Sequence, residues 1–117
     1  VQAACRESGQ QVPEGLAQVA SVIYNSLARC YAETIRQIEG ITGRKYDKIH
    51  IVGGGSNAEY LNRLTAAATG IPVYAGPTEA TAIGNIAAQM MATGELADLK
   101  AARACVFRSF SITTYQP

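Results

Sequence analysis

Ile-Val-Gly-Gly-Gly-Ser-Asn-Ala, residues 51–58, is the stretch of this sequence from which the rest of the architecture can be inferred. The β-branched run at residues 49–52 predicts a short buried strand that the glycines end. Ser56 predicts the N-terminal cap of a helix over residues 57–69, and Gly70 predicts where that helix stops. A strand, a glycine turn and a helix in this order begin a β-α-β unit.

The residues after this unit predict a second strand and two more helices. Residues 71–75 (Ile-Pro-Val-Tyr-Ala) form a short β-type run with its proline near the start, where a missing amide is tolerated. Thr78 predicts the cap of a helix over residues 79–92, which is apolar nearly all round and is therefore expected to be buried on several sides. A shorter helix is expected over residues 96–105, while residues 106–117 alternate too weakly to predict an element.

The residues before the glycine run predict one long amphipathic helix. Residues 1–12 are polar and typical of turns, and residues 45–48 form a charged linker. Between them, residues 14–39 carry apolar side chains at steps of three and four, with Pro13 before the start and Gly40 at the expected stop.

The length and composition allow a single domain with a core. The chain has 117 residues, of which 48% are apolar, and this is the size of one ordinary domain. The predicted class is α/β, with short parallel strands covered by helices. A sheet of two parallel strands has two open edges, so we expect the chain to be part of a larger sheet and to self-associate when isolated.

Charge and composition argue against several classes of partner. A net charge of +1 lacks the basic face that nucleic-acid binding normally needs, and no apolar run approaches the roughly 20 residues that span a bilayer. The first residues resemble no secretion signal. Three cysteines without a C-x-x-C pair, and His50 as the one histidine, predict no metal site and reduced thiols in the cytoplasm.

The glycine run is the main candidate for a binding site. Without side chains, the backbone of Gly53, Gly54 and Gly55 allows a flat base or a phosphate to approach, and the following helix adds free amides and its positive dipole end. The alternative is a tight turn that binds nothing. Gly53-x-Gly55-x-x-Ala58 also fits the dinucleotide fingerprint, but the next strand is not followed by the required acid before Glu79, and no Walker sequence is present.

Residues 76–85 are a second candidate segment, beginning with a Gly76-Pro77 turn. Glu79 is favoured in a first helical turn by the helix dipole. Gly84 lies inside a predicted helix at a cost of about 1 kcal/mol against alanine, so we expect a neighbouring element to approach it closely. The alternative is that this helix backs a nucleotide cavity.

These segments resemble the C-terminal end of sugar kinases of the FGGY family. The resemblance covers almost the whole chain in order, at residues 12–14, 41–43, 50–56, 61–62, 68–73 and 75–86. It implies a partial ribonuclease H-like (actin-like ATPase) domain, so that residues 1–117 form one nucleotide-binding, C-terminal domain fragment. It also implies a parent enzyme that uses ATP and Mg²⁺ to phosphorylate a ketose, L-rhamnulose, at its 1-position in L-rhamnose catabolism.

The resemblance assigns roles to a few residues. Gly53, Gly54 and Gly55 would line the adenosine and the α-phosphate, with Gly54 the foremost of them, and Ser56 and Asn57 would lie beside them. It places the catalytic aspartate and the sugar site upstream of Val1. We therefore expect a fragment that supplies the nucleotide loop, no catalytic residue and no metal ligand, and that is inactive alone.

Two other interpretations stay open. A related kinase of the same family, acting on fuculose, xylulose or glycerol, would differ in the upstream sugar site. A non-catalytic binding or assembly module would use the glycine turn for structure alone.

Overall fold

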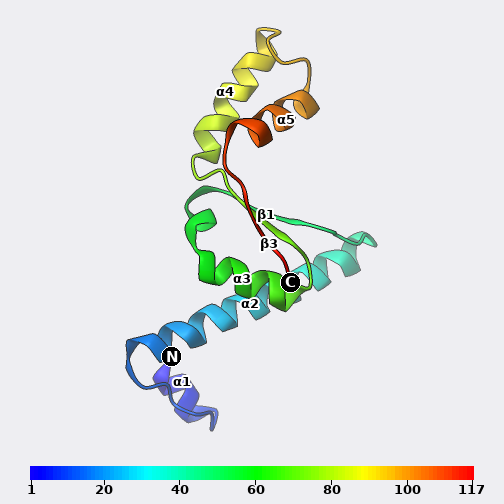
Figure 1. Cartoon of the computed structure of the whole chain (residues 1–117). Helices are drawn as coiled ribbons and strands as arrows, with labels where there is room; N and C mark the ends of the chain where they lie inside the picture. Colours follow the sequence, from blue (N-terminus) through cyan, green and yellow to red (C-terminus); the bar gives the residue numbers. More distant parts are fainter.

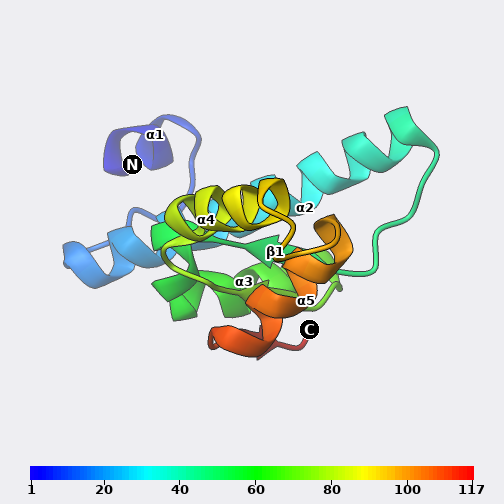
Figure 2. The same cartoon turned by 90° about the horizontal axis from the view of Figure 1, so that it is seen from above.

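The computed structural model describes all residues 1–117 and builds a small sheet between two pairs of helices (Figure 1). The helices α2 and α3 lie on one side of the strands, and α4 and α5 lie together on the other side (Figures 1 and 2). In chain order the elements are α1 (Gln2–Glu7), α2 (Gly15–Thr42), β1 (Ile49–Ile51), the 3-10 helix η1 (Gly53–Asn57), α3 (Glu59–Thr69), β2 (Val73–Ala75), α4 (Ala80–Ala92), α5 (Leu99–Ser109) and β3 (Thr113–Tyr115).

The sheet has three strands in the order β1-β2-β3. β1 and β2 are parallel, with Ile49 beside Val73, as the β-α-β prediction required. β3 pairs antiparallel with β2, placing Tyr115 beside Val73. The prediction of two strands, with no element over residues 106–117, was therefore wrong. The strand β3 was missed because it buries only Tyr115 and leaves Thr113 and Thr114 exposed, so its sequence carries a weak apolar pattern.

The core lies between α3 and the sheet. It consists of four buried side chains with two half-buried isoleucines of β1 against them: Ala66, Val73, Ala75 and Tyr115, with Ile49 and Ile51. β1 was predicted to be buried, but His50 and Val52 are exposed because β1 is an edge strand. Since the outer edges of β1 and β3 are open, self-association of the isolated chain stays a prediction.

The predicted long helix is confirmed as α2, although its C-terminal boundary differs. The helix runs through Gly40 and ends at Gly43, whose left-handed φ of 65° and N–H bond to the Glu39 carbonyl (2.9 Å) form the cap. Its small buried residues Ala28 and Ala32 lie on the face that packs on α3.

The N-terminal residues were predicted to form turns, but they contain the short helix α1. The hexapeptide Gln-Ala-Ala-Cys-Arg-Glu holds no glycine or proline, and its alanines favour a helix. Cys5 is buried, and the side-chain amide of Gln2 donates a hydrogen bond to the Pro13 carbonyl (2.9 Å), which holds α1 near the start of α2.

Gly40→Ala is expected to stabilise the protein by about 0.5–1 kcal/mol, because glycine in a helix loses more conformational freedom than alanine. The Cβ added at Gly40 meets no atom within 4 Å, so no clash opposes this gain. Urea unfolding of wild type and variant measures the change in the free energy of unfolding. A destabilised variant would contradict the prediction.

The charged linker of residues 45–48 is held to the end of α2 through Glu39. The Lys45 ammonium donates to the Glu39 carboxylate at 2.5 Å, and the Tyr46 N–H donates to it at 3.2 Å. These two bonds, the Lys45 bond first, lower the pKa of Glu39 from its ordinary value. They join the linker to the last turns of α2.

The last helix begins later than the predicted residue 96, at Leu99. Asp98 caps it by accepting a hydrogen bond from the Ala101 N–H (2.7 Å), which occupies this carboxylate in a structural role.

The α4 helix was predicted to be buried on several sides, and within this chain that prediction is wrong. None of its residues is buried, and Ile86 is 58% exposed. The expectation of a close neighbour at Gly84 is also wrong, because an added Cβ there meets no atom within 4 Å. The chain is elongated, at 60 × 34 × 22 Å, and its radius of gyration of 18.1 Å exceeds the roughly 13 Å of a globular domain of this length.

No helix of the structure is both long enough and apolar enough to cross a membrane. Cys5, Cys30 and Cys105 are all unpaired.

Candidate functional site

The glycine run forms a tight 3-10 turn, η1, directly after β1. Gly53 has a left-handed φ of +73°, and its N–H donates a hydrogen bond to the Pro77 carbonyl (3.0 Å). The Ser56 hydroxyl does not cap the next helix as predicted. It donates to the Gly53 carbonyl (2.7 Å) inside the turn, and α3 begins only at Glu59 with no side-chain cap.

The two candidate segments of the sequence meet at one edge of the sheet. η1 follows β1, and the Gly76-Pro77-Thr78 turn follows β2, so both leave the carboxyl ends of parallel strands. Two main-chain bonds join them, from the Gly53 N–H to the Pro77 carbonyl (3.0 Å) and from the Gly76 N–H to the Ile51 carbonyl (2.8 Å). In open α/β sheets this edge is where ligands bind.

A chain of polar side chains completes the contact between these segments. The Thr78 hydroxyl donates to Asn57 Oδ1 (3.2 Å) and lies 3.3 Å from Ser56 Oγ. Thr78 was predicted to cap the following helix, but that helix has no side-chain cap, because the hydroxyl points to η1 instead.

Asn62 supports η1 from α3 and was not among the predicted site residues. It is 1% exposed, and its Nδ2 donates to the Ser56 carbonyl (3.1 Å). The signal for it in the sequence is an asparagine at helical spacing from Thr65 and Ala66 on the buried face of α3, since a buried amide needs hydrogen-bond partners.

Of the three glycines of η1, only Gly53 is required by the structure of the chain itself. Gly53 is required by its positive φ. A Cβ at Gly55 would lie at ordinary contact distance, 3.5 Å, from Ile51 Cγ2. A Cβ at Gly54 would meet no atom of the chain within 4 Å, and φ is not positive there. The interpretation as a purely structural turn therefore accounts for Gly53 but requires glycine at neither Gly54 nor Gly55, and the space at Gly54 is fully open.

Gly76 is required by packing. A Cβ there would lie 2.7 Å from the Ser111 carbonyl oxygen, and φ is +122°. The turn after β2 thus lies directly against the segment that leads into β3.

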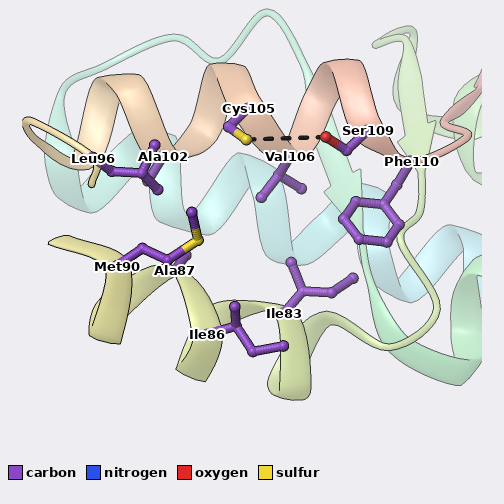
Figure 3. Close-up of a pocket in the computed structure, with 10 residues that line it drawn as sticks. All are labelled: Ile83, Ile86, Ala87, Met90, Leu96, Ala102, Cys105, Val106, Ser109 and Phe110. Carbon is purple, nitrogen blue, oxygen red and sulfur yellow. Dashed lines mark hydrogen bonds between the residues drawn. The ribbon is translucent and has the colours of Figure 1, made fainter. Parts of the chain in front are cut away.

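Two cavities lie near this region, and the glycines of η1 line neither. A groove of about 950 Å³ between α4, α5 and the sheet is bordered by Val52, Gly76 and Pro77, so it adjoins the turn. A smaller cavity of about 90 Å³ lies between α4 and α5 and is lined almost wholly by apolar side chains (Figure 3). Phe110 and Ile83 lie at one end of it, and Leu96 lies at the other (Figure 3).

The polar groups of the site are hydroxyls, amides and main-chain N–H groups, which suit binding. The two aspartates lie elsewhere: Asp98 caps α5, and Asp47 lies 3.8 Å from the Lys48 ammonium in the linker. His50 stacks on Tyr74 across the two parallel strands, at 5.4 Å between ring centres. No three His, Cys, Asp or Glu side chains cluster as metal ligands.

Comparisons with known proteins identify the family of the chain. Residues 2–93 match the model of the C-terminal domain of the FGGY family of carbohydrate kinases. The chain is 48% identical to a rhamnulokinase of Enterococcus faecalis, with 99% of the chain covered, and 44% identical to those of Ligilactobacillus salivarius and Bacillus subtilis, with 100% covered.

The chain spans about a quarter of the length of each of these relatives, 24% in all three. Its mixed α/β fold is that of the actin-like ATPase domain to which the family model corresponds. Because the family model matches residues 2–93 and the relatives are 44–48% identical over nearly the whole chain, this chain belongs to the FGGY family of carbohydrate kinases and lies in its C-terminal domain.

Proposed function

We propose that this chain is the nucleotide-binding part of a longer sugar kinase that transfers the γ-phosphoryl group of ATP to L-rhamnulose, giving L-rhamnulose 1-phosphate in L-rhamnose catabolism. The family supports a carbohydrate kinase, and the relatives named rhamnulokinase support this sugar. We place the reaction in the cytoplasm, where unpaired thiols stay reduced.

The observation that carries the nucleotide site is the open space at Gly54 together with its position in the turn at the carboxyl end of the parallel strand β1. Neither backbone conformation nor packing within the chain accounts for glycine there, although glycine has a conformational cost of about 0.5–1 kcal/mol. A ligand that lies against the backbone gives a reason, because any side chain would occupy its place. In this proposal Gly53, Gly54 and Gly55 lie along the adenosine and the α-phosphate, with Ser56 and Asn57 beside them.

The chain's own residues supply binding and orientation. Phosphoryl transfer depends mostly on positioning and on electrostatic stabilisation. η1 and the turn after β2, bonded to each other, offer a rigid surface for the nucleotide. In such reactions Mg²⁺ neutralises charge on the phosphates. No three possible metal ligands cluster in this chain, so we assign no Mg²⁺ ligand to residues 1–117, and we assign the catalytic base to none of them either.

Substrate assays of the full-length protein that contains this chain test the proposal. With ATP as donor, L-rhamnulose is expected to give the highest kcat/KM among L-rhamnulose, L-fuculose, D-xylulose and glycerol. The separate 117-residue chain, purified free of other kinases, is expected to give no turnover. A preference for another of these substrates, or turnover by the separate chain, would contradict the proposal.

A further inference from the structure

Thr78 is the one side chain that joins the turn after β2 to both polar side chains of η1. Its hydroxyl donates to Asn57 Oδ1 (3.2 Å) and lies 3.3 Å from Ser56 Oγ. These partners are 21 and 22 residues away in sequence, so the contact depends on the tertiary fold.

The hydroxyl of Thr78 is held in place by its surroundings. The turn that carries it is fixed to β1 and η1 by the main-chain bonds of Gly53 and Gly76, at 3.0 and 2.8 Å. A β-branched side chain also has a restricted χ1 angle. Thr78 therefore presents its hydroxyl to η1 from a fixed position.

Asn57 is held mainly by this contact. It is exposed at the end of η1, and its Oδ1 accepts the bond from Thr78. Its Nδ2 makes no hydrogen bond within the chain, so two N–H donors stay available for an acceptor atom outside it. A side chain that is already ordered avoids the loss of freedom that binding would otherwise impose.

We propose that Thr78 is a positioning residue for the nucleotide: it does not touch the ligand, but it orients the Asn57 amide so that Nδ2 donates to an acceptor atom of the nucleotide. The inference rests on the proposed function, because it assumes that ATP lies along η1. It extends the site to a residue that the glycine run does not contain.

A double-mutant cycle in the full-length protein, with ATP as the titrant in calorimetry, tests the role. Thr78→Val keeps the shape and removes the hydroxyl, and is expected to raise the Kd for ATP about 3- to 10-fold, as for one lost hydrogen bond. Thr78→Ser is expected to restore affinity to within about twofold of wild type. In an Asn57→Ala background, Thr78→Val should have no further effect, because Thr78 acts through Asn57.

Additive effects of the two substitutions, or wild-type affinity in Thr78→Val, would overturn the inference. Thr93→Val is the matched control, because the Thr93 hydroxyl bonds only to carbonyls of its own helix, at 3.2 and 3.3 Å. It should leave the Kd for ATP unchanged. A rise in Kd for this control equal to that of Thr78→Val would also count against the inference.

A measurement without ligand separates this inference from the proposed function. In the unliganded protein, Thr78→Val is expected to increase the nanosecond mobility of the Asn57 side-chain amide in NMR relaxation of selectively labelled asparagine. Unchanged mobility would overturn the positioning role whether or not ATP binds. Failure of wild type to bind ATP, with mobility increased as expected, would instead overturn the proposed function and the ligand assigned to Asn57.

Discussion

Gly54→Val in the full-length kinase is expected to lower the affinity for ATP by about 5- to 150-fold while leaving the fold intact. Forcing a branched side chain into space that a ligand fills typically costs about 1–3 kcal/mol, which is up to two orders of magnitude in binding. The backbone has room for a side chain to begin at Gly54, because a Cβ there meets no atom of the chain within 4 Å and φ is not positive. Titration calorimetry with ATP measures the loss, and circular dichroism checks the fold.

Gly40→Ala and Gly54→Ala form the matched pair for this prediction. Both glycines have ordinary φ and no atom within 4 Å of the added Cβ, but Gly40 lies in α2, away from η1. Only the substitution at Gly54 should weaken ATP binding, and less than valine does. Equal affinities across the whole series would contradict a nucleotide at η1 and would favour the turn as a structural element.

The helices and the parallel pair could be predicted because their signals are local. The spacing of apolar residues in α2 and the β-branched residues around Ile51 are read within a few positions. β3 could not be predicted, since its pairing with β2 depends on residues about 40 positions away and its side chains are mostly exposed. The helix stop at Gly40 failed because two glycines compete, and only Gly43 takes up the left-handed conformation.

The sequence predicted which segments form the candidate site, but it did not predict which hydrogen bonds their side chains make. The sequence indicated both segments, and the structure brings them together at the ends of β1 and β2. Ser56 and Thr78 were predicted to cap helices, which is the usual role of such residues before an apolar run. Instead, the Ser56 hydroxyl donates to the Gly53 carbonyl inside η1, and the Thr78 hydroxyl donates to Asn57 Oδ1 across the two turns. The two hydroxyls lie 3.3 Å apart, a proximity that no local pattern encodes.

Gly76→Ala is expected to destabilise the protein by about 3 kcal/mol, the largest effect on stability among the substitutions considered. The added Cβ would lie 2.7 Å from the Ser111 carbonyl oxygen and 3.6 Å from Ile112 Cα. Both atoms are main chain, so no flexible side chain can move aside. The φ of +122° adds strain for any residue with a Cβ, and overpacking and strain each cost about 1–3 kcal/mol. Urea unfolding measures the loss.

Gly94→Ala separates the two causes, because Gly94 also has a positive φ (+83°) but no atom within 4 Å of the added Cβ. Its free energy of unfolding should fall only by the cost of the strained backbone conformation, about 1 kcal/mol. The excess at Gly76 is then the clash with the segment that leads into β3, and faster amide hydrogen exchange at Tyr115 should accompany it. Because the Gly76 N–H also holds the Ile51 carbonyl at 2.8 Å, the same substitution should loosen η1 and weaken ATP binding. Equal losses at Gly76 and Gly94 would show that β3 yields freely and that the turn does not depend on it.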